Sequence, residues 1–111
     1  MARLASSVLV GALLRRAQNQ GGFGAVLHKG DPMAGAIAVI LAEKGARRCF
    51  LERLLQPDGH YAWQSARQES EDDAGFAAFL ERRQRFDPDL WILELDIASA
   101  ERFAAEMNES G

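Results

Sequence analysis

The stretch RCFLERLLQPDGHYAWQS, residues 48–65, carries the strongest structural signal in the chain. Two strand-like segments flank the residues Pro-Asp-Gly at 57–59, which suit a type I turn closed by a bulge. Strands joined by such a turn pair as an antiparallel hairpin. In the register that this turn favours, Arg53 lies opposite Trp63 on one face of the hairpin. The stretch therefore predicts two neighbouring strands with an arginine and a tryptophan side by side.

The spacing of apolar residues predicts the elements around this hairpin. In chain order they are a helix over 4–20, strands over 23–28, 36–43, 48–55 and from 61 onward, a helix after Ser70, a strand over 90–97 and a helix over 99–107. Ser70, with Asp73 three residues later, resembles the N-terminal cap of the second helix, and Ser99 caps the last one.

This order of elements predicts an α+β fold in a single domain of residues 1–111. Short loops make the first four strands antiparallel neighbours. The last strand arrives after a helical crossover, and we expect it beside the first strand as an antiparallel edge. A place beside the fourth strand, in parallel, is the alternative. The expected architecture is therefore a mainly antiparallel sheet of about five strands with packed helices, in the order α-β-β-β-β-α-β-α.

The composition is that of an ordinary soluble domain. Of 111 residues, 48% are hydrophobic and 26% are charged. The net charge of −3 argues against a nucleic-acid-binding protein. Cys49 is the only cysteine, which excludes an intramolecular disulfide, and with only two histidines in the chain a zinc site built from Cys and His alone is also excluded. We expect no cofactor and no metal site.

The N-terminal apolar run, residues 8–14, bears on the location of the protein. It is seven residues long, whereas a membrane span needs about 20. It is followed by Arg15 and Arg16 without a small-x-small cleavage site, so an amphipathic helix is favoured over a signal peptide. We therefore expect a cytoplasmic protein with no membrane partner.

Four residues are candidates for binding or chemistry. Arg53 opposite Trp63 allows a cation–π contact that only supports the fold, or a site in which the arginine binds an anion beside a stacking wall. Asp87 and Asp89 flank a proline. They form a local turn, or they bind a cation or an arginine, or they act as an acid–base pair. No glycine-rich phosphate loop and no nucleophile elbow accompany them.

Two glutamates stand in strands that are otherwise apolar, Glu52 and Glu94. Each is either a buried acid with a raised pKa or a carboxylate paired with an arginine at a partly solvated position. The second reading is favoured, because unpaired carboxylates are rarely buried.

Three segments resemble a known family. They are MARL (1–4) leading into the helix with Arg15 and Arg16, LQPDG (55–59) followed by YAW (61–63), and RFDPDLW (85–91). Together they resemble a bacterial family of short proteins called domain of unknown function 1491, over essentially the whole chain. The resemblance implies no activity, cofactor or catalytic residue that could be carried over to this sequence.

The leading functional hypothesis is a small non-catalytic cytoplasmic module that binds an unidentified protein or small molecule. The alternative is a small enzyme that uses Asp87 and Asp89 as acid and base and Arg53 as an anion-binding group. Convergence of these three side chains in one pocket would favour the enzyme. We also expect a homodimer formed through the sheet, because strands 36–43 and 90–97 are apolar on both faces and three helices leave one face partly open.

Overall fold

Three helices and five strands form the computed structural model of the protein, which describes residues 4–67 and 73–109. The elements are α1 (Ser6–Asn19), β1 (Phe23–His28), β2 (Ile37–Glu43), β3 (Ala46–Leu55), β4 (Tyr61–Arg67), α2 (Asp73–Phe86), β5 (Trp91–Asp96) and α3 (Ala100–Glu109). Their order and the α+β class agree with the prediction. The expected cap at Ser70 lies outside the described residues.

The five strands form one mixed sheet in the order β1-β5-β2-β3-β4. β5 is antiparallel to β1 and parallel to β2, and the other pairs are antiparallel. The last strand therefore does lie beside the first, but on its inner side. The prediction that β1 and β2 are neighbours, with β5 at the edge, is wrong. The reason is burial: Ile92 and Leu93 point to opposite faces and both are fully buried, which an edge strand does not achieve.

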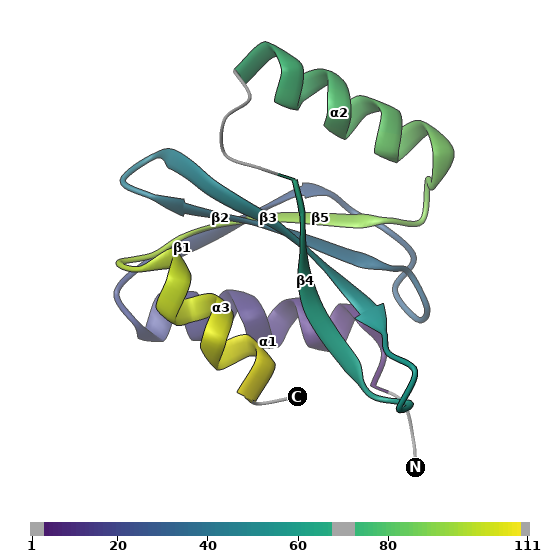
Figure 1. Ribbon diagram of the computed structural model, residues 1–111, viewed down its shortest axis with the longest axis horizontal. Coiled ribbons are helices and arrows are strands. Elements are labelled where there is room, and N and C mark those ends of the chain that lie inside the picture. The colour runs from purple at the N-terminus through teal and green to yellow at the C-terminus, as the bar shows by residue number, and fades with distance from the viewer. Residues whose placement is uncertain (1–3, 68–72, 110–111) are drawn as a thin grey trace.

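Helices cover both faces of the sheet, with α1 and α3 on one side and α2 on the other (Figure 1). β2 serves both cores, because successive side chains of a strand alternate between faces. Val39 and Leu41 pack on the side of α1 and α3, while Ala38 and Ile40 pack beneath α2. Each large apolar side chain buried in this way contributes about 1.5–3 kcal/mol to stability.

The β3–β4 hairpin has the predicted register. Arg53 pairs with Trp63, and the Gln56 N–H donates to the His60 carbonyl oxygen at 2.7 Å to close the turn. Gly59 has a φ of +90°, the left-handed conformation that the turn requires. The hairpin thus places Arg53 on the same face of the sheet as α1 and α3.

α3 is attached to the outer edge of β4 through Asn108. The Trp63 N–H donates to Asn108 Oδ1 at 2.8 Å, and Asn108 Nδ2 donates to the Trp63 carbonyl oxygen at 3.2 Å. One amide side chain thus occupies the position where a further strand would bond.

The N-terminal apolar run forms part of α1 and contributes to the core. Val10 within the run, and Ala17 further along α1, are buried against the sheet. Among the described helices, none has the length and hydropathy required to cross a bilayer.

Candidate functional site

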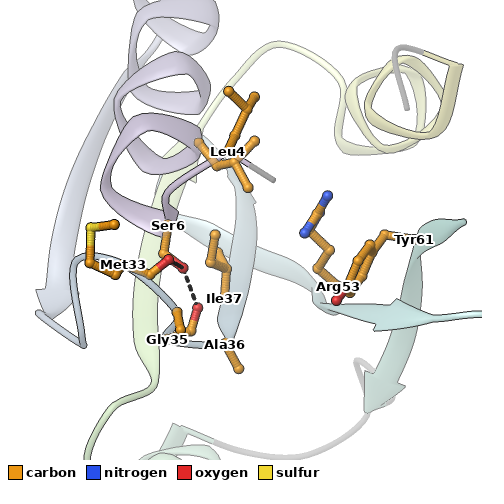
Figure 2. Close-up of a pocket in the computed structure, with 10 residues that line it drawn as sticks. Leu4, Ser6, Met33, Gly35, Ala36, Ile37, Arg53 and Tyr61 are labelled. Atoms are coloured by element: carbon orange, nitrogen blue, oxygen red, sulfur yellow. Dashed lines mark hydrogen bonds between the residues drawn. The ribbon is translucent and has the colours of Figure 1, made fainter. Parts of the chain in front are cut away.

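A pocket of about 190 Å³ lies between the start of α1, the loop before β2 and the β3–β4 hairpin. Figure 2 shows that Ser6 and the loop form one side of the pocket and that Arg53 and Tyr61 approach from the hairpin. The lining residues are Leu4, Ser6, Leu9, Met33, Ala34, Gly35, Ala36, Ile37, Arg53 and Tyr61. Apart from Ser6, Arg53 and Tyr61, these side chains are apolar or absent.

The start of α1 is bonded directly to the pocket loop. The Ser6 side chain is buried, and its hydroxyl donates to the Gly35 carbonyl oxygen at 2.6 Å. The N–H groups of Ser6 and Ser7 donate to the carbonyl oxygens of Met33 and Pro32 at 3.2 and 2.9 Å. These N–H groups of the first helical turn need such partners, because they have none within the helix. The helix and the loop therefore form one rigid side of the pocket.

The loop is also held from behind by the start of β5. The Trp91 indole N–H donates to the Asp31 carbonyl oxygen at 2.7 Å, and the Asp31 N–H donates to the Asp89 carbonyl oxygen at 3.0 Å. A Cβ at Gly35 would lie 2.3 Å from that same Asp89 oxygen, so no larger residue fits without movement. The Asp31 carboxylate accepts the N–H groups of Met33 and Ala34, as in an Asx turn.

Arg53 lies against Tyr61 on the other side of the pocket. The guanidinium carbon is 4.1 Å from the centroid of the Tyr61 ring, within the range of a cation–π contact. The sequence suggested Trp63 as the aromatic partner. Trp63 is the cross-strand neighbour, but its side chain packs against the core beneath α1 and α3. Tyr61 is the diagonal neighbour, which a long arginine side chain reaches.

Two other arginines, Arg47 and Arg83, are paired with glutamates on the face of the sheet beneath α2. The Arg47 Nε lies 2.8 Å from Glu94 Oε2, and Arg83 forms an ion pair with Glu52. Their guanidinium carbons lie 5.0 and 5.9 Å from the ring centroids of Phe76 and Phe79, respectively. The two strand glutamates are therefore arginine-paired, the favoured reading of the sequence.

Asp87 and Asp89 lie in the turn between α2 and β5. Asp87 Oδ1 accepts the Asp89 N–H at 3.2 Å, and the Asp87 carbonyl oxygen accepts the Leu90 N–H at 3.1 Å. These are the local bonds of a turn. Neither aspartate lines the pocket that Arg53 borders. The pocket does not bring together the three side chains of the enzyme hypothesis, and a ligand-binding role for either aspartate stays a prediction.

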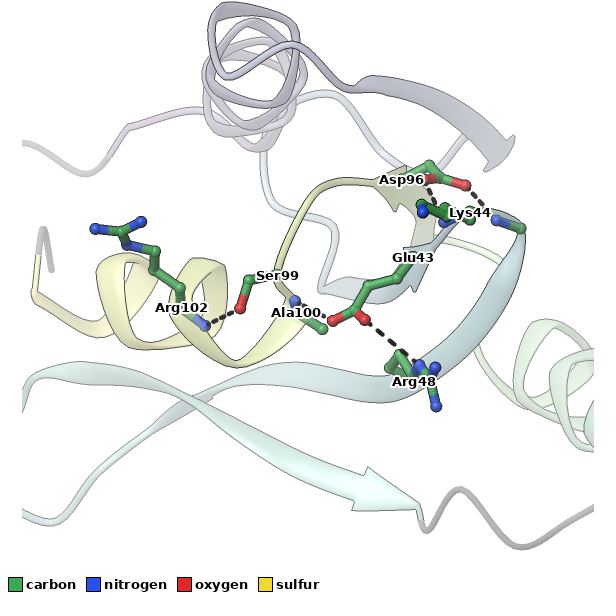
Figure 3. A network of polar contacts seen from close by, with 8 residues as sticks. Glu43, Lys44, Arg48, Asp96, Ser99, Ala100 and Arg102 are labelled. Atoms are coloured by element: carbon green, nitrogen blue, oxygen red, sulfur yellow. Dashed lines mark hydrogen bonds and ion pairs between the residues drawn. The ribbon is translucent and has the colours of Figure 1, made fainter.

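A polar network at the opposite end of β2 and β5 is structural (Figure 3). The Asp96 carboxylate accepts the N–H groups of Lys44 and Gly45 at 3.0 and 2.7 Å, and Glu43 accepts the Ala100 N–H at 2.7 Å. Ser99 accepts the Arg102 N–H, which confirms the predicted cap of the last helix. These contacts close a tight turn and hold the start of α3. Within the described ranges, no group of acidic, histidine or cysteine side chains has the arrangement of a metal site.

Sequence reasoning missed most of the pocket. Leu4, Ser6 and Met33 come from segments that are brought together only by the fold. Tyr61 had a usable signal, because the hairpin register puts it on the same face as Arg53.

Comparisons with known proteins agree on one family. The family model "Protein of unknown function (DUF1491)" matches residues 4–105. A crystal structure of a DUF1491 family protein from Caulobacter crescentus CB15 is similar with 30% identity and a TM-score of 0.79, over 91% of this chain and 94% of that chain. An NMR structure of a DUF1491 family protein from the same organism gives 31% identity and a TM-score of 0.77, over 93% and 94%.

A third solved structure is also similar. The solution structure of protein Atu0922 from A. tumefaciens gives 32% identity and a TM-score of 0.74, over 92% of each chain. A search among curated proteins finds no match. Because the family model covers nearly the whole sequence, this chain belongs to the DUF1491 family of proteins of unknown function.

Proposed function

We propose that this protein is a non-catalytic interaction module that binds an acidic group of a protein partner in the pocket beside Arg53. The observation that carries the proposal is the position of the Arg53 guanidinium, stacked on Tyr61 at the border of a cavity with apolar walls. A guanidinium held in one orientation by an aromatic ring is well suited to bind a carboxylate.

The size of the pocket favours an end group over a whole metabolite. Its volume of about 190 Å³ is below the 300–1,000 Å³ that is typical of small-molecule sites. A space of this size accepts one carboxylate with a short apolar stem, such as an acidic side chain or the C-terminus of a chain.

The rim of the pocket favours a protein as the carrier of that group. Leu4 and Met33 line the pocket and are 61% and 71% exposed, and Leu55, beside Tyr61, is 60% exposed. Exposed apolar residues around a pocket are typical of protein-binding surfaces. A partner would cover this rim while its carboxylate reached Arg53.

The chemistry of the lining supports binding over catalysis. The ten lining residues that the structure describes include no histidine, cysteine, lysine or carboxylate that could act as a general base. Ser6 is the serine among these residues, and its hydroxyl donates to the Gly35 carbonyl oxygen. His28 hydrogen-bonds through Nδ1 to the Leu90 carbonyl oxygen, and His60 is exposed at the hairpin turn.

The test is a titration of isotope-labelled protein, monitored through its backbone amide resonances. Butyrate provides a carboxylate on a short apolar stem, and butylammonium is the matched probe of opposite charge. We expect butyrate to shift the amides of Ser6, Gly35 and Tyr61, and butylammonium to leave them unchanged. Equal shifts with both probes, or none with butyrate, would contradict the proposal.

A pair of variants assigns the binding to Arg53. Arg53→Gln removes the charge at the pocket, and we expect the butyrate shifts to disappear. Arg48→Gln is the matched control, because Arg48 lies on the same strand near Glu43, outside the pocket lining. This variant should bind butyrate as the unmodified protein does.

We also propose that the protein acts in the cytoplasm. Burial of Val10 and Ala17 in the core supports this, because α1 is then needed by the folded domain. Cys49, the single cysteine of the sequence, forms no disulfide within the chain, which is compatible with a reducing compartment. Fractionation of cells that express the chain tests the proposal, and recovery of the protein outside the cytoplasm would contradict it.

A further inference from the structure

The sheet has two edge strands, and among the residues that the structure describes only one of the two edges carries a cap. At the outer edge of β4, the side chain of Asn108 binds both the N–H and the carbonyl oxygen of Trp63. Such coverage prevents an edge strand from pairing with another chain. For β1, no side chain from another described element bonds to the backbone.

The sequence of β1 also lacks the charged residues and prolines that usually protect an edge, although its register shifts between Val26 and His28, as at a bulge. Phe23–His28 reads FGAVLH, without a proline, lysine, arginine, aspartate or glutamate. Phe23 is 66% exposed, and Val26 and Leu27 are each 42% exposed. Charged residues and prolines are the common means of keeping such an edge monomeric. The open backbone of β1 is therefore bordered by apolar side chains.

Those side chains flank the open edge on both faces of the sheet. Phe23 pairs with Asp96 and Val26 with Leu93, and three positions along a strand place two side chains on opposite faces. A strand added at this edge would therefore gain backbone hydrogen bonds and apolar cover above and below them. An uncharged strand of this kind also fits itself, since no like charges meet when two copies approach.

We infer that β1 pairs with β1 of a second copy of this chain, in antiparallel orientation about a twofold axis. Antiparallel pairing of identical edges is isologous and closed, so it ends at a dimer instead of a fibre. The two five-stranded sheets become one continuous sheet, with the capped β4 edges at its two outer ends. The interface is the edge of the sheet and not its face: helices cover both faces, so the open face expected from the sequence is no longer the argument for a dimer.

Light scattering at a series of concentrations tests the inference on the full chain. We expect a mass of twice 12.2 kDa at high micromolar concentration, falling to 12.2 kDa on dilution. Phe23→Lys and Val26→Lys each place two like charges at the interface and should weaken dimerisation by about 100-fold. Gln64→Lys adds the same charge to the capped edge strand and should leave the dimer intact.

Two further measurements make each outcome decisive. Circular dichroism and the unfolding midpoint show that a variant is folded before its mass is interpreted. Amide hydrogen exchange over residues 23–28 should slow as concentration rises, while exchange over 61–67 should not. A monomer at all concentrations would overturn the inference, as would a dimer that both folded β1 variants keep.

Discussion

Arg83 and Arg53 both lie against an aromatic ring, but they lie on opposite faces of the sheet and have different neighbours. Beneath α2, Arg83 is ion-paired with Glu52 beside the ring of Phe79. On the other face, Arg53 is stacked on Tyr61 and borders a pocket. Beneath α2, the ion pair with Glu52 helps to hold the helix on the sheet. Beside the pocket, we propose that the arginine and its aromatic neighbour bind a carboxylate of a partner.

The packing around the two arginines also differs, since Arg83 lies beside a closed core and Arg53 beside an exposed pocket. The core beneath α2 is closed by three phenylalanine rings, with Phe50 in edge-to-face contact with Phe76 and Phe79 at centroid distances of 6.0 and 5.1 Å. The pocket around Arg53 is bordered by Leu4 and Met33, which are largely exposed. The region beneath α2 is a packed core, whereas the region around Arg53 has apolar side chains exposed at the surface.

Phe50→Ala should have the largest effect on stability, because it empties the centre of the α2 core. The side chain is fully buried, and loss of such a phenylalanine costs about 3–5 kcal/mol of the free energy of unfolding. Urea unfolding at a fixed protein concentration measures it. Leu54→Ala, at an exposed position of the same strand, is the control and should cost less than about 1 kcal/mol. A similar loss in both variants would mean that the α2 side is not a closed core.

Arg83→Gln should lower the free energy of unfolding by about 1–2 kcal/mol, because it leaves the largely buried Glu52 carboxylate without its charged partner. Arg82→Gln removes a neighbouring exposed charge and serves as the control. Equal stability of the two variants in urea unfolding would show that the Arg83–Glu52 pair does not hold α2.

Gly59→Ala should cost about 1 kcal/mol through backbone strain alone. Its φ is +90°, and a Cβ added there meets no atom within 4 Å, so a steric clash does not contribute. The hairpin that carries Arg53 and Tyr61 should keep its register. An unchanged thermal midpoint would contradict the assigned turn. Loss of the Arg53–Tyr61 contact would show that the conformation of the turn determines the geometry of the pocket.

Local signals predicted the elements and the hairpin, whereas the position of β5 and the pocket depended on distant contacts. The Pro-Asp-Gly turn sets the Arg53–Trp63 pairing over ten residues, which a sequence can reveal. β5 is inserted between β1 and β2 because side chains on both of its faces are buried. Which strand takes this central place depends on all the strands together, so no short segment of the sequence reveals it. The pocket needs the start of α1 to meet the loop at Met33, a contact across 27 positions.

Arg53→Gln should have the smallest effect on stability. A partly exposed cation–π contact contributes about 0.5–1 kcal/mol, so the variant should unfold close to the unmodified protein. The same urea experiment that measures Arg83→Gln checks this. If Arg53→Gln lowered the free energy of unfolding as much as Arg83→Gln does, the main role of Arg53 would be to stabilise the fold.

The most direct test of the pocket as the binding site measures butyrate binding in Arg53→Gln and Arg83→Gln side by side, with the amide resonances of Ser6, Gly35 and Tyr61 as the readout. We expect Arg53→Gln to stay stable and to lose the butyrate-induced shifts. We expect Arg83→Gln to be less stable and to keep them, at a temperature where it is folded. Retained shifts in folded Arg53→Gln, or their loss in folded Arg83→Gln, would contradict the assignment of the pocket as the binding site.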